Sequence, residues 1–163
     1  MCTHKLFATL LFLFSCSLQA ATLQGKVVSV SDSDTIKVLD ATNTQHKIRL
    51  QGIDAPEKAQ PFGQKSKQSL SQLVYNKQVT VEYQKKDKYG RTLGKVILNG
   101  TDVCLEQIKL GMAWHYKQYN SDQTKEDRET YAQAELAAQT QMIGLWKDKN
   151  PTPPWEFRKQ KNN

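Results

Sequence analysis

The sequence predicts an α+β fold in which a five-stranded β-barrel carries about three helices. Three β-type runs come first, a helix-type stretch follows, and two more β-type runs come after it. This is the element order of the OB-fold, a small Greek-key barrel. The length of 163 residues suits one compact domain with a single core. The predicted strands cover residues 22–30, 35–39, 44–51, 79–83 and 93–98, and the helix among them covers residues 64–76.

The third predicted strand shows the alternation that orients its side chains. Ile48 and Leu50 share one face, whereas Lys47 and Arg49 share the other. Because a barrel buries only one face of each strand, Arg49 is expected to point away from the core.

Helical spacing of apolar residues predicts the remaining elements. In residues 64–76, Leu70, Leu73 and Val74 recur at the spacing of one helix face. A short helix is predicted near residues 103–110 and a longer one over residues 122–142. One side of the longer helix is expected to carry Tyr131, Ala134, Ala138 and Met142.

The first 20 residues differ in character from the rest. Lys5 precedes an apolar run from Leu6 to Phe14, and small and polar residues then lead to Ala20. This pattern is typical of a secretory signal peptide and predicts a secreted or periplasmic protein. The run is too short to span a bilayer, which takes about 20 residues. A lipoprotein signal at Cys16 and a short buried helix are the alternatives.

Three segments are therefore expected: a signal peptide over 1–20, a folded domain over 21–149, and a Pro-rich basic tail over 150–163. The tail is predicted to be extended and mobile apart from an anchor at Trp155. Signal cleavage would leave Cys104 as the single cysteine, so the mature protein could form no internal disulfide. Cys104 is expected to be a small buried thiol rather than a nucleophile.

The charge balance favours a polyanionic partner. The chain has 23 Lys and Arg against 16 Asp and Glu, a net charge of +7. A basic surface suits a nucleic acid or a membrane face, although many exported proteins are basic.

Two aspartates at strand ends form a candidate metal site. Asp34 borders the second strand and Asp54 follows the third, so their carboxylates are expected to lie close together. With no His or Cys nearby in the sequence, this is a hard oxygen site that suits calcium or magnesium. Asp32 lies in the same turn and is expected to serve the turn itself.

Charged residues around these aspartates supply the other parts of a phosphodiesterase site. Arg49, Glu57 and Arg91 could each be an ordinary solvated side chain, but their spacing suggests convergence on one patch. Guanidinium groups and a metal would neutralise charge that grows at phosphorus, and a carboxylate would orient or deprotonate water.

Three motifs in order carry a resemblance to the staphylococcal nuclease family over residues 22–147. The family motif D-G-D-T corresponds to Asp32-Ser33-Asp34-Thr35 of this sequence. The motif R-x4-D-T-P-E corresponds to Arg49 to Glu57, and the motif K-Y-G-R corresponds to Lys88-Tyr89-Gly90-Arg91. Gly144-Leu145-Trp146 also resembles the end of the family's last helix.

The resemblance implies a calcium-dependent nuclease that acts on DNA and RNA. It implies that Asp34, Asp54 and the Ala55 backbone carbonyl bind Ca²⁺, and that Arg49 and Arg91 grip the scissile phosphate. Glu57 would be the general base or water-orienting group. Lys88 and Tyr89 would bind the neighbouring phosphate, and Tyr119 would contact the 5′ side. A monomer without stable membrane association is expected.

Two positions depart from the family pattern. Ser33 replaces a glycine in the first turn, and Ala55 replaces a threonine. A backbone carbonyl survives any side-chain change, so Ala55 is expected to be tolerated. Two other functions remain open: a non-catalytic OB-fold that binds single strands through basic and aromatic groups, and a basic interaction protein in which the motifs are structural.

Overall fold

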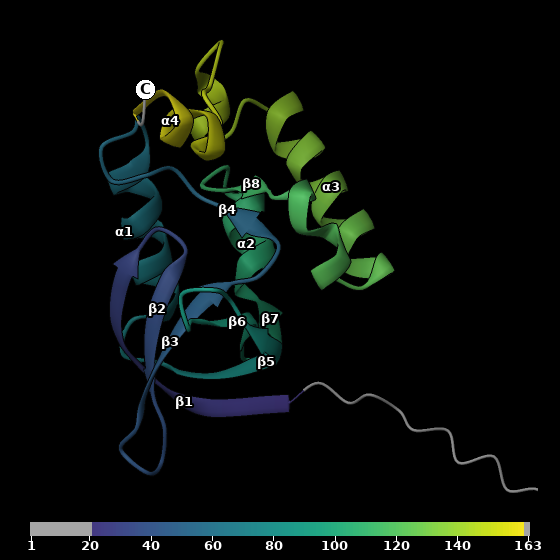
Figure 1. Ribbon diagram of the computed structural model, residues 1–163. Coiled ribbons are helices and arrows are strands. Elements are labelled where there is room, and N and C mark those ends of the chain that lie inside the picture. Colours follow the sequence, from purple (N-terminus) through teal and green to yellow (C-terminus); the bar gives the residue numbers. More distant parts are fainter. Residues whose placement is uncertain (1–20, 162–163) are drawn as a thin grey trace, which may run out of the picture.

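The barrel is closed by five strands (Figure 1). The computed structural model describes residues 21–161. Neighbouring strands pair in the order β3-β2-β1-β5-β6, all antiparallel, and a parallel pairing of β3 with β6 closes the barrel. The predicted α+β OB-fold is therefore confirmed. The barrel strands are β1 (Ala21–Asp32), β2 (Thr35–Leu39), β3 (Gln45–Leu50), β5 (Gln78–Lys86) and β6 (Thr92–Leu98).

The first strand can pair on both sides because it bends. Its register against β2 shifts between Val27 and Ser29 and again between Val30 and Asp32. Such bulges increase local twist and turn a strand from one part of a barrel to the next. At Gly25 a Cβ atom would overlap the Leu39 carbonyl, so this close approach requires glycine.

The barrel core has the composition that the alternating pattern predicts. Ile48 and Leu50 of β3 are fully buried, whereas Arg49 between them is not part of that core. Ile36 of β2 pairs directly with Ile48, and Thr35 pairs with Arg49. The strand-end aspartates are thus brought to the same end of the barrel as Arg49.

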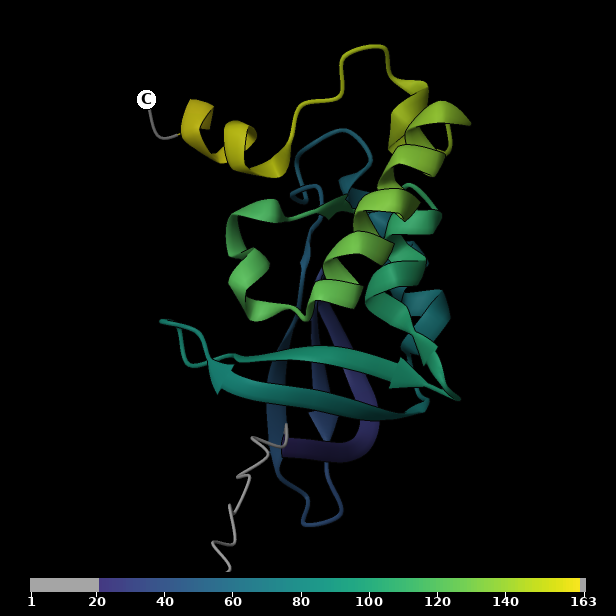
Figure 2. The ribbon, with the colours of Figure 1, turned by 90° about the vertical axis from the view of Figure 1, so that its right-hand side faces the viewer.

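The helices lie at one end of the barrel (Figure 2). Three of them pack together there. They are α1 (Gly63–Val74), α2 (Val103–Lys109) and α3 (Lys125–Thr140). Helix α2 contacts both of the others. The Asp102 side chain caps α2 by accepting from the Cys104 and Leu105 N–H groups, and Thr124 caps α3 by accepting from Asp127 N–H. The Thr124 cap explains why α3 begins three residues later than expected.

Several short elements connect these parts. Strands β4 (Ile53–Asp54) and β8 (Trp114–His115) pair with each other, and β7 (Thr101–Asp102) extends the sheet beyond β6. Two 3₁₀ helices, η1 (Lys117–Asp122) and η2 (Gly144–Lys147), flank α3. No helix among residues 21–161 is long and apolar enough to cross a membrane. The predicted signal peptide, including Cys16, lies outside the described residues.

Two sequence-based expectations are wrong. The C-terminal segment is not simply extended, because residues Pro154–Lys161 form helix α4. Proline is well tolerated at the first position of a helix, where its missing N–H costs nothing. Met142 is 64% exposed, because the chain leaves α3 at Thr140 and Met142 has a positive φ. The buried Cys104 is confirmed, and burial raises the pKa of its thiol far above the usual range.

Candidate active site

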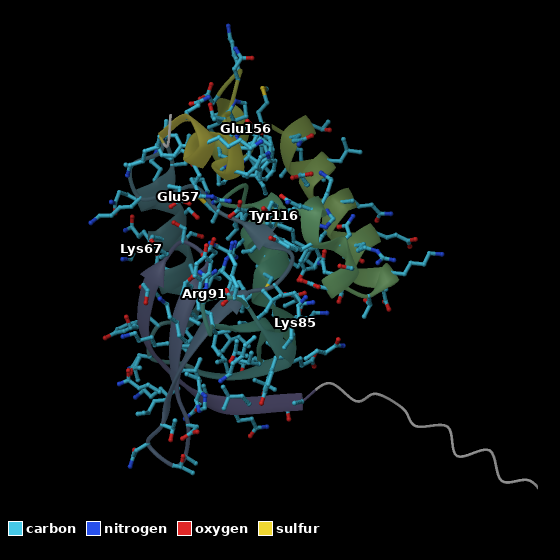
Figure 3. The ribbon with its side chains drawn as sticks, in the orientation of Figure 1. Glu57, Lys67, Lys85, Arg91, Tyr116 and Glu156 are labelled. Carbon is cyan, nitrogen blue, oxygen red and sulfur yellow. The ribbon has the colours of Figure 1, made fainter. Side chains whose placement is uncertain are left out.

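A charged cavity of about 590 Å³ opens at the end of the barrel where β2, β3 and β4 meet. It is bounded by the β1–β2 turn, the β4–α1 loop, the β5–β6 turn, η1 and α4. Figure 3 shows Glu57, Arg91, Tyr116 and Lys85 around this region. The structure brings all the predicted site residues into its lining: Asp34, Arg49, Asp54, Ala55, Glu57, Lys88, Tyr89, Arg91 and Tyr119.

The two aspartates converge on one nitrogen. Nη2 of Arg49 lies 3.1 Å from Oδ2 of Asp34 and 3.1 Å from Oδ1 of Asp54. Asp34 is fixed by its carbonyl, which accepts from Leu50 N–H at 2.9 Å, and by Thr35, whose hydroxyl donates to Oδ1. The predicted proximity of the two carboxylates is therefore present in the structure.

Ser33 gives the first turn a side-chain hydrogen bond that glycine could not form. Its side chain is buried, and its hydroxyl donates to the carbonyl of Gly63 at 3.1 Å. Gly63 begins α1, so this hydrogen bond joins the turn that carries Asp34 to the helix after the β4–α1 loop.

Asp54 is a buried carboxylate in contact with two cations. Its side chain is 2% exposed. Burial raises its pKa, while the hydrogen bond from Arg158 and the charge of Arg49 oppose that rise. Because burial disfavours the ionised form, the site gains from holding positive charge beside this group.

Arg49 contacts both acids, and both of its terminal nitrogens are engaged within the protein. Nη1 donates to the carbonyls of Leu50 and Ile53, each at 2.9 Å, and Nη2 reaches both aspartates. Its side chain is only 12% exposed. Of the five N–H donors of a guanidinium, three make hydrogen bonds here, and Nε has no acceptor among residues 21–161.

Arg91 is engaged differently. Its Nε donates to Oδ2 of Asp87 at 2.6 Å, and its terminal nitrogens meet no acceptor among residues 21–161. Both can therefore fork onto phosphate oxygens. Asp87 also accepts from the N–H groups of Tyr89 and Arg91 and so shapes the β5–β6 turn. Sequence reasoning missed Asp87, although an aspartate that opens a Gly-containing turn is a usable signal.

The β5–β6 turn presents an aromatic ring between cations. Tyr89 is 71% exposed. Nζ of Lys88 lies 5.1 Å and Cζ of Arg91 lies 5.4 Å from its ring centroid, distances that permit cation–π attraction. The turn therefore offers two cations and a ring to a ligand in the cavity.

The tryptophan and tyrosines from β8 to η1 divide into two groups. Trp114 packs away from the cavity against Trp146, with centroids 4.3 Å apart. Tyr116 and Tyr119 line the cavity, with centroids 5.1 Å apart. Burial raises the pKa of the Tyr116 hydroxyl, and the nearby Asp54 adds to that rise, so this group stays protonated. Sequence reasoning chose Tyr119 and left out Tyr116.

Arg158 is a third functional candidate that sequence reasoning missed. It comes from α4, yet Nη2 lies 2.8 Å from Oδ2 of Asp54 and Nη1 lies 2.8 Å from Oε1 of Glu57. The segment was interpreted as a mobile tail, and one arginine in a basic tail has no distinguishing pattern.

The donors around Asp54 fit a hard divalent cation. Asp34, Asp54 and Glu57 supply carboxylate oxygens, and Ala55 lies beside them in the same cavity wall. Within residues 21–161 no three acidic, His or Cys side chains are already gathered as a closed metal cluster. An ion bound by few protein groups would keep several waters, as calcium and magnesium sites permit.

The closed barrel and its cavity define an OB-fold protein with a site where guanidinium and carboxylate groups meet. A family model described as staphylococcal nuclease homologue matches residues 47–148. The chain therefore belongs to the staphylococcal nuclease family.

Three relatives resemble nearly the whole chain. An uncharacterized endonuclease of Haemophilus influenzae is 44% identical over 163 residues, which cover 98% of this chain and 88% of the relative. An uncharacterized endonuclease of Escherichia coli O157:H7 is 40% identical over 159 residues, which cover 97% of this chain and 99% of the relative. A micrococcal nuclease of Shigella flexneri is 36% identical over 152 residues, which cover 88% of this chain and 84% of the relative. The chain is thus similar over its length to proteins with nuclease names.

Proposed function

We propose that this protein is an exported, calcium-dependent nuclease that hydrolyses phosphodiester bonds in single-stranded or locally opened DNA and RNA. Family membership and the nuclease names of its relatives support the reaction class. The observation that carries the proposal is the convergence of Arg91, Glu57 and two strand-end aspartates on one cavity. Export is proposed from the signal-like pattern of residues 1–20.

Arg91 is the side chain best placed to hold the scissile phosphate. Its terminal nitrogens are free of protein acceptors within the described chain, and its Nε is fixed by Asp87. A fixed fork aimed at a phosphate stabilises negative charge that grows as phosphorus becomes five-coordinate. Lys88 and Tyr89 on the same turn would contact the neighbouring phosphate.

Glu57 is the group best suited to handle the attacking water. Its side chain is 39% exposed, and its Oε2 accepts no hydrogen bond from residues 21–161. That oxygen can take a proton from water as the water oxygen bonds to phosphorus and the bond to the leaving oxygen breaks. The loop holds Glu57 in place, because its N–H donates to Oε1 of Gln60.

Asp34 and Asp54 are the proposed ligands for Ca²⁺, together with the Ala55 carbonyl. When bound, the cation would neutralise phosphate charge. Calcium is proposed over magnesium because the family resemblance implies it and because calcium accepts flexible oxygen geometry, whereas magnesium demands a near-ideal octahedron. Weak affinity is expected, on the order of 10⁻⁴ to 10⁻³ M as in extracellular calcium modules.

The competing function is a non-catalytic OB-fold that binds single strands. Lys88, Tyr89, Tyr116 and Tyr119 would suit it. It gives no reason for Asp34, Asp54 and Glu57 to gather in an anion-binding cavity, where their carboxylates would repel phosphate. Purified protein incubated with denatured DNA or RNA, with calcium or with chelator, separates the two: only a nuclease shortens the strands.

A further inference from the structure

A cation from the far end of the chain lies on the proposed metal ligand. Arg158 grips the Asp54 carboxylate with two nitrogens: Nη2 lies 2.8 Å from Oδ2 and Nη1 lies 3.3 Å from Oδ1. Nη1 also lies 2.8 Å from Oε1 of Glu57. One guanidinium therefore joins the proposed calcium ligand to the proposed general base.

This arrangement is held by the packing of α4. Trp155 stacks on Tyr116 with centroids 5.4 Å apart and meets Trp114 edge-on at 5.7 Å. Pro154, the first residue of α4, is buried. Trp155 and Arg158 are three residues apart, so they project from the same side of the helix. The aromatic anchor thus positions the guanidinium over the cavity.

The charge of Asp54 makes this contact more than a surface ion pair. The carboxylate is 2% exposed, and Arg49 and Arg158 are the two cations that contact it among the described residues. A carboxylate offers about four lone-pair positions. Arg49 uses one on Oδ1, and Arg158 uses one on each oxygen. These contacts leave about one lone pair free, so a divalent cation has to bind Asp54 directly beside the positively charged Arg158 guanidinium or displace it.

We propose that Arg158 is a resident counter-cation that competes with the divalent cation for Asp54, and that α4 thereby sets the cation affinity of the site. This inference rests on the proposed calcium dependence. Calcium binding and release of Arg158 from Asp54 are linked, and the 41% exposed side chain has room to leave while α4 stays anchored. In the metal-free protein, Arg158 keeps the buried carboxylate neutralised.

Calorimetric titration of the mature protein with CaCl₂, without nucleic acid, tests the competition. Arg158→Gln should bind calcium about tenfold or more tightly than the parent, the effect expected when one charge-assisted hydrogen-bonding group stops competing. Arg158→Lys keeps the charge but loses the fork, so it should fall between the two. Lys159→Gln is the matched control, because it removes one positive charge from an exposed residue of α4 whose one side-chain partner among residues 21–161 is Glu156. Its calcium affinity should remain within about twofold of the parent.

Thermal melting supplies a second readout that does not depend on activity. In chelator, Arg158→Gln should melt below the parent because Asp54 loses a counter-cation, and added calcium should raise its Tm more than it raises the parent's. If Arg158→Gln does not fold, the Arg158→Lys titration decides. A parent that binds calcium as tightly as Arg158→Gln or Arg158→Lys overturns the inference and leaves the proposed function intact. No calcium binding to parent or variants overturns both the inference and the calcium dependence.

Discussion

Nη2 of Arg49 lies 3.1 Å from Oδ1 of Asp54, an aspartate whose side chain is 2% exposed. This contact gives Arg49 a structural role beside its proposed catalytic one. Its Nη1 donates to the backbone carbonyls of Leu50 and Ile53. Arg49 therefore links the end of β3 to the start of β4. The terminal nitrogens of Arg91, by comparison, have no acceptor among the described residues 21–161.

The two arginines should therefore respond differently to truncation. Arg91→Ala should lower turnover by about 10² to 10³-fold, because it removes donors that act on transition-state charge. Its stability should change little. Arg91→Lys should rescue poorly, since a point charge cannot fork a phosphate. Steady-state cleavage of a labelled single-stranded oligonucleotide measures the loss, and parent-level turnover in Arg91→Lys would argue against a forked contact.

Arg49→Ala should lose stability as well as activity. Breaking a buried ion pair by removing one partner costs about 3–5 kcal/mol, although Arg158 still covers part of Asp54 and should reduce that cost. Urea denaturation of Arg49→Ala and Arg91→Ala side by side measures the difference. Equal stability of the two variants would mean that Arg49 does not brace the acids.

Ser33→Ala tests the tie between the first turn and α1. The Ser33 hydroxyl donates to the Gly63 carbonyl in a buried setting, so its removal should cost about 0.5–1.5 kcal/mol in the free energy of unfolding. The catalytic rate should change little, because Asp34 keeps its bonds to Leu50 and Thr35. Thr42→Ala, in an exposed turn, serves as the control for loss of a hydroxyl. A Ser33→Ala protein as stable as the parent would show that the tie contributes nothing.

His115 should make stability depend on pH. Burial lowers the pKa of this side chain below its ordinary value of 6.5. Its Nε2 contacts Oε1 of Gln123 at 3.0 Å, and Nδ1 has no partner within the described chain. The unfolded chain therefore binds the proton more readily than the folded one. The stabilisation that comes from keeping His115 neutral is complete above about pH 6.5, and it is lost as the pH falls toward the lowered pKa of the folded protein.

Urea denaturation between pH 7.5 and pH 5 measures this dependence. The free energy of unfolding should decrease on acidification, and the decrease should be smaller in His115→Gln, which has no titrating ring. The comparison uses the pH slope of each protein, so a lower absolute stability of the variant does not affect it. Identical slopes would refute the assignment to His115.

The sequence predicts the barrel well because its signals are local. Alternation in β3 assigned Ile48 and Leu50 to the core, and the three motifs lie in turns and strand ends whose positions follow from strand order. Among the functional residues that were missed, Asp87 acts within its own turn, whereas Arg158 depends on distant packing. Arg158 reaches Asp54 because Trp155 docks on Tyr116, a contact between segments about 40 residues apart that no local pattern encodes. Met142 was misplaced because α3 ends before it.

Export can be checked on the protein itself. The signal-like pattern predicts cleavage after Ala20 or Ala21, and β1 begins at Ala21, so either site leaves the barrel strand essentially complete. Intact-mass analysis of protein recovered from the periplasm or medium should give a chain that begins at residue 21 or 22 and carries no lipid. A retained N-terminus, or a lipid-modified Cys16, would contradict the prediction.

Cleavage of denatured DNA by Glu57→Ala tests the central claim most directly. The parent should cut denatured DNA with calcium and stop in chelator. Glu57→Ala should lower turnover by about 10² to 10⁴-fold, the usual contribution of a positioned acid or base, while strand binding survives. Lys58→Ala, the exposed neighbour, is the matched control and should cut at close to the parent rate. A Glu57→Ala protein that is folded by circular dichroism and cuts at the parent rate would contradict the account.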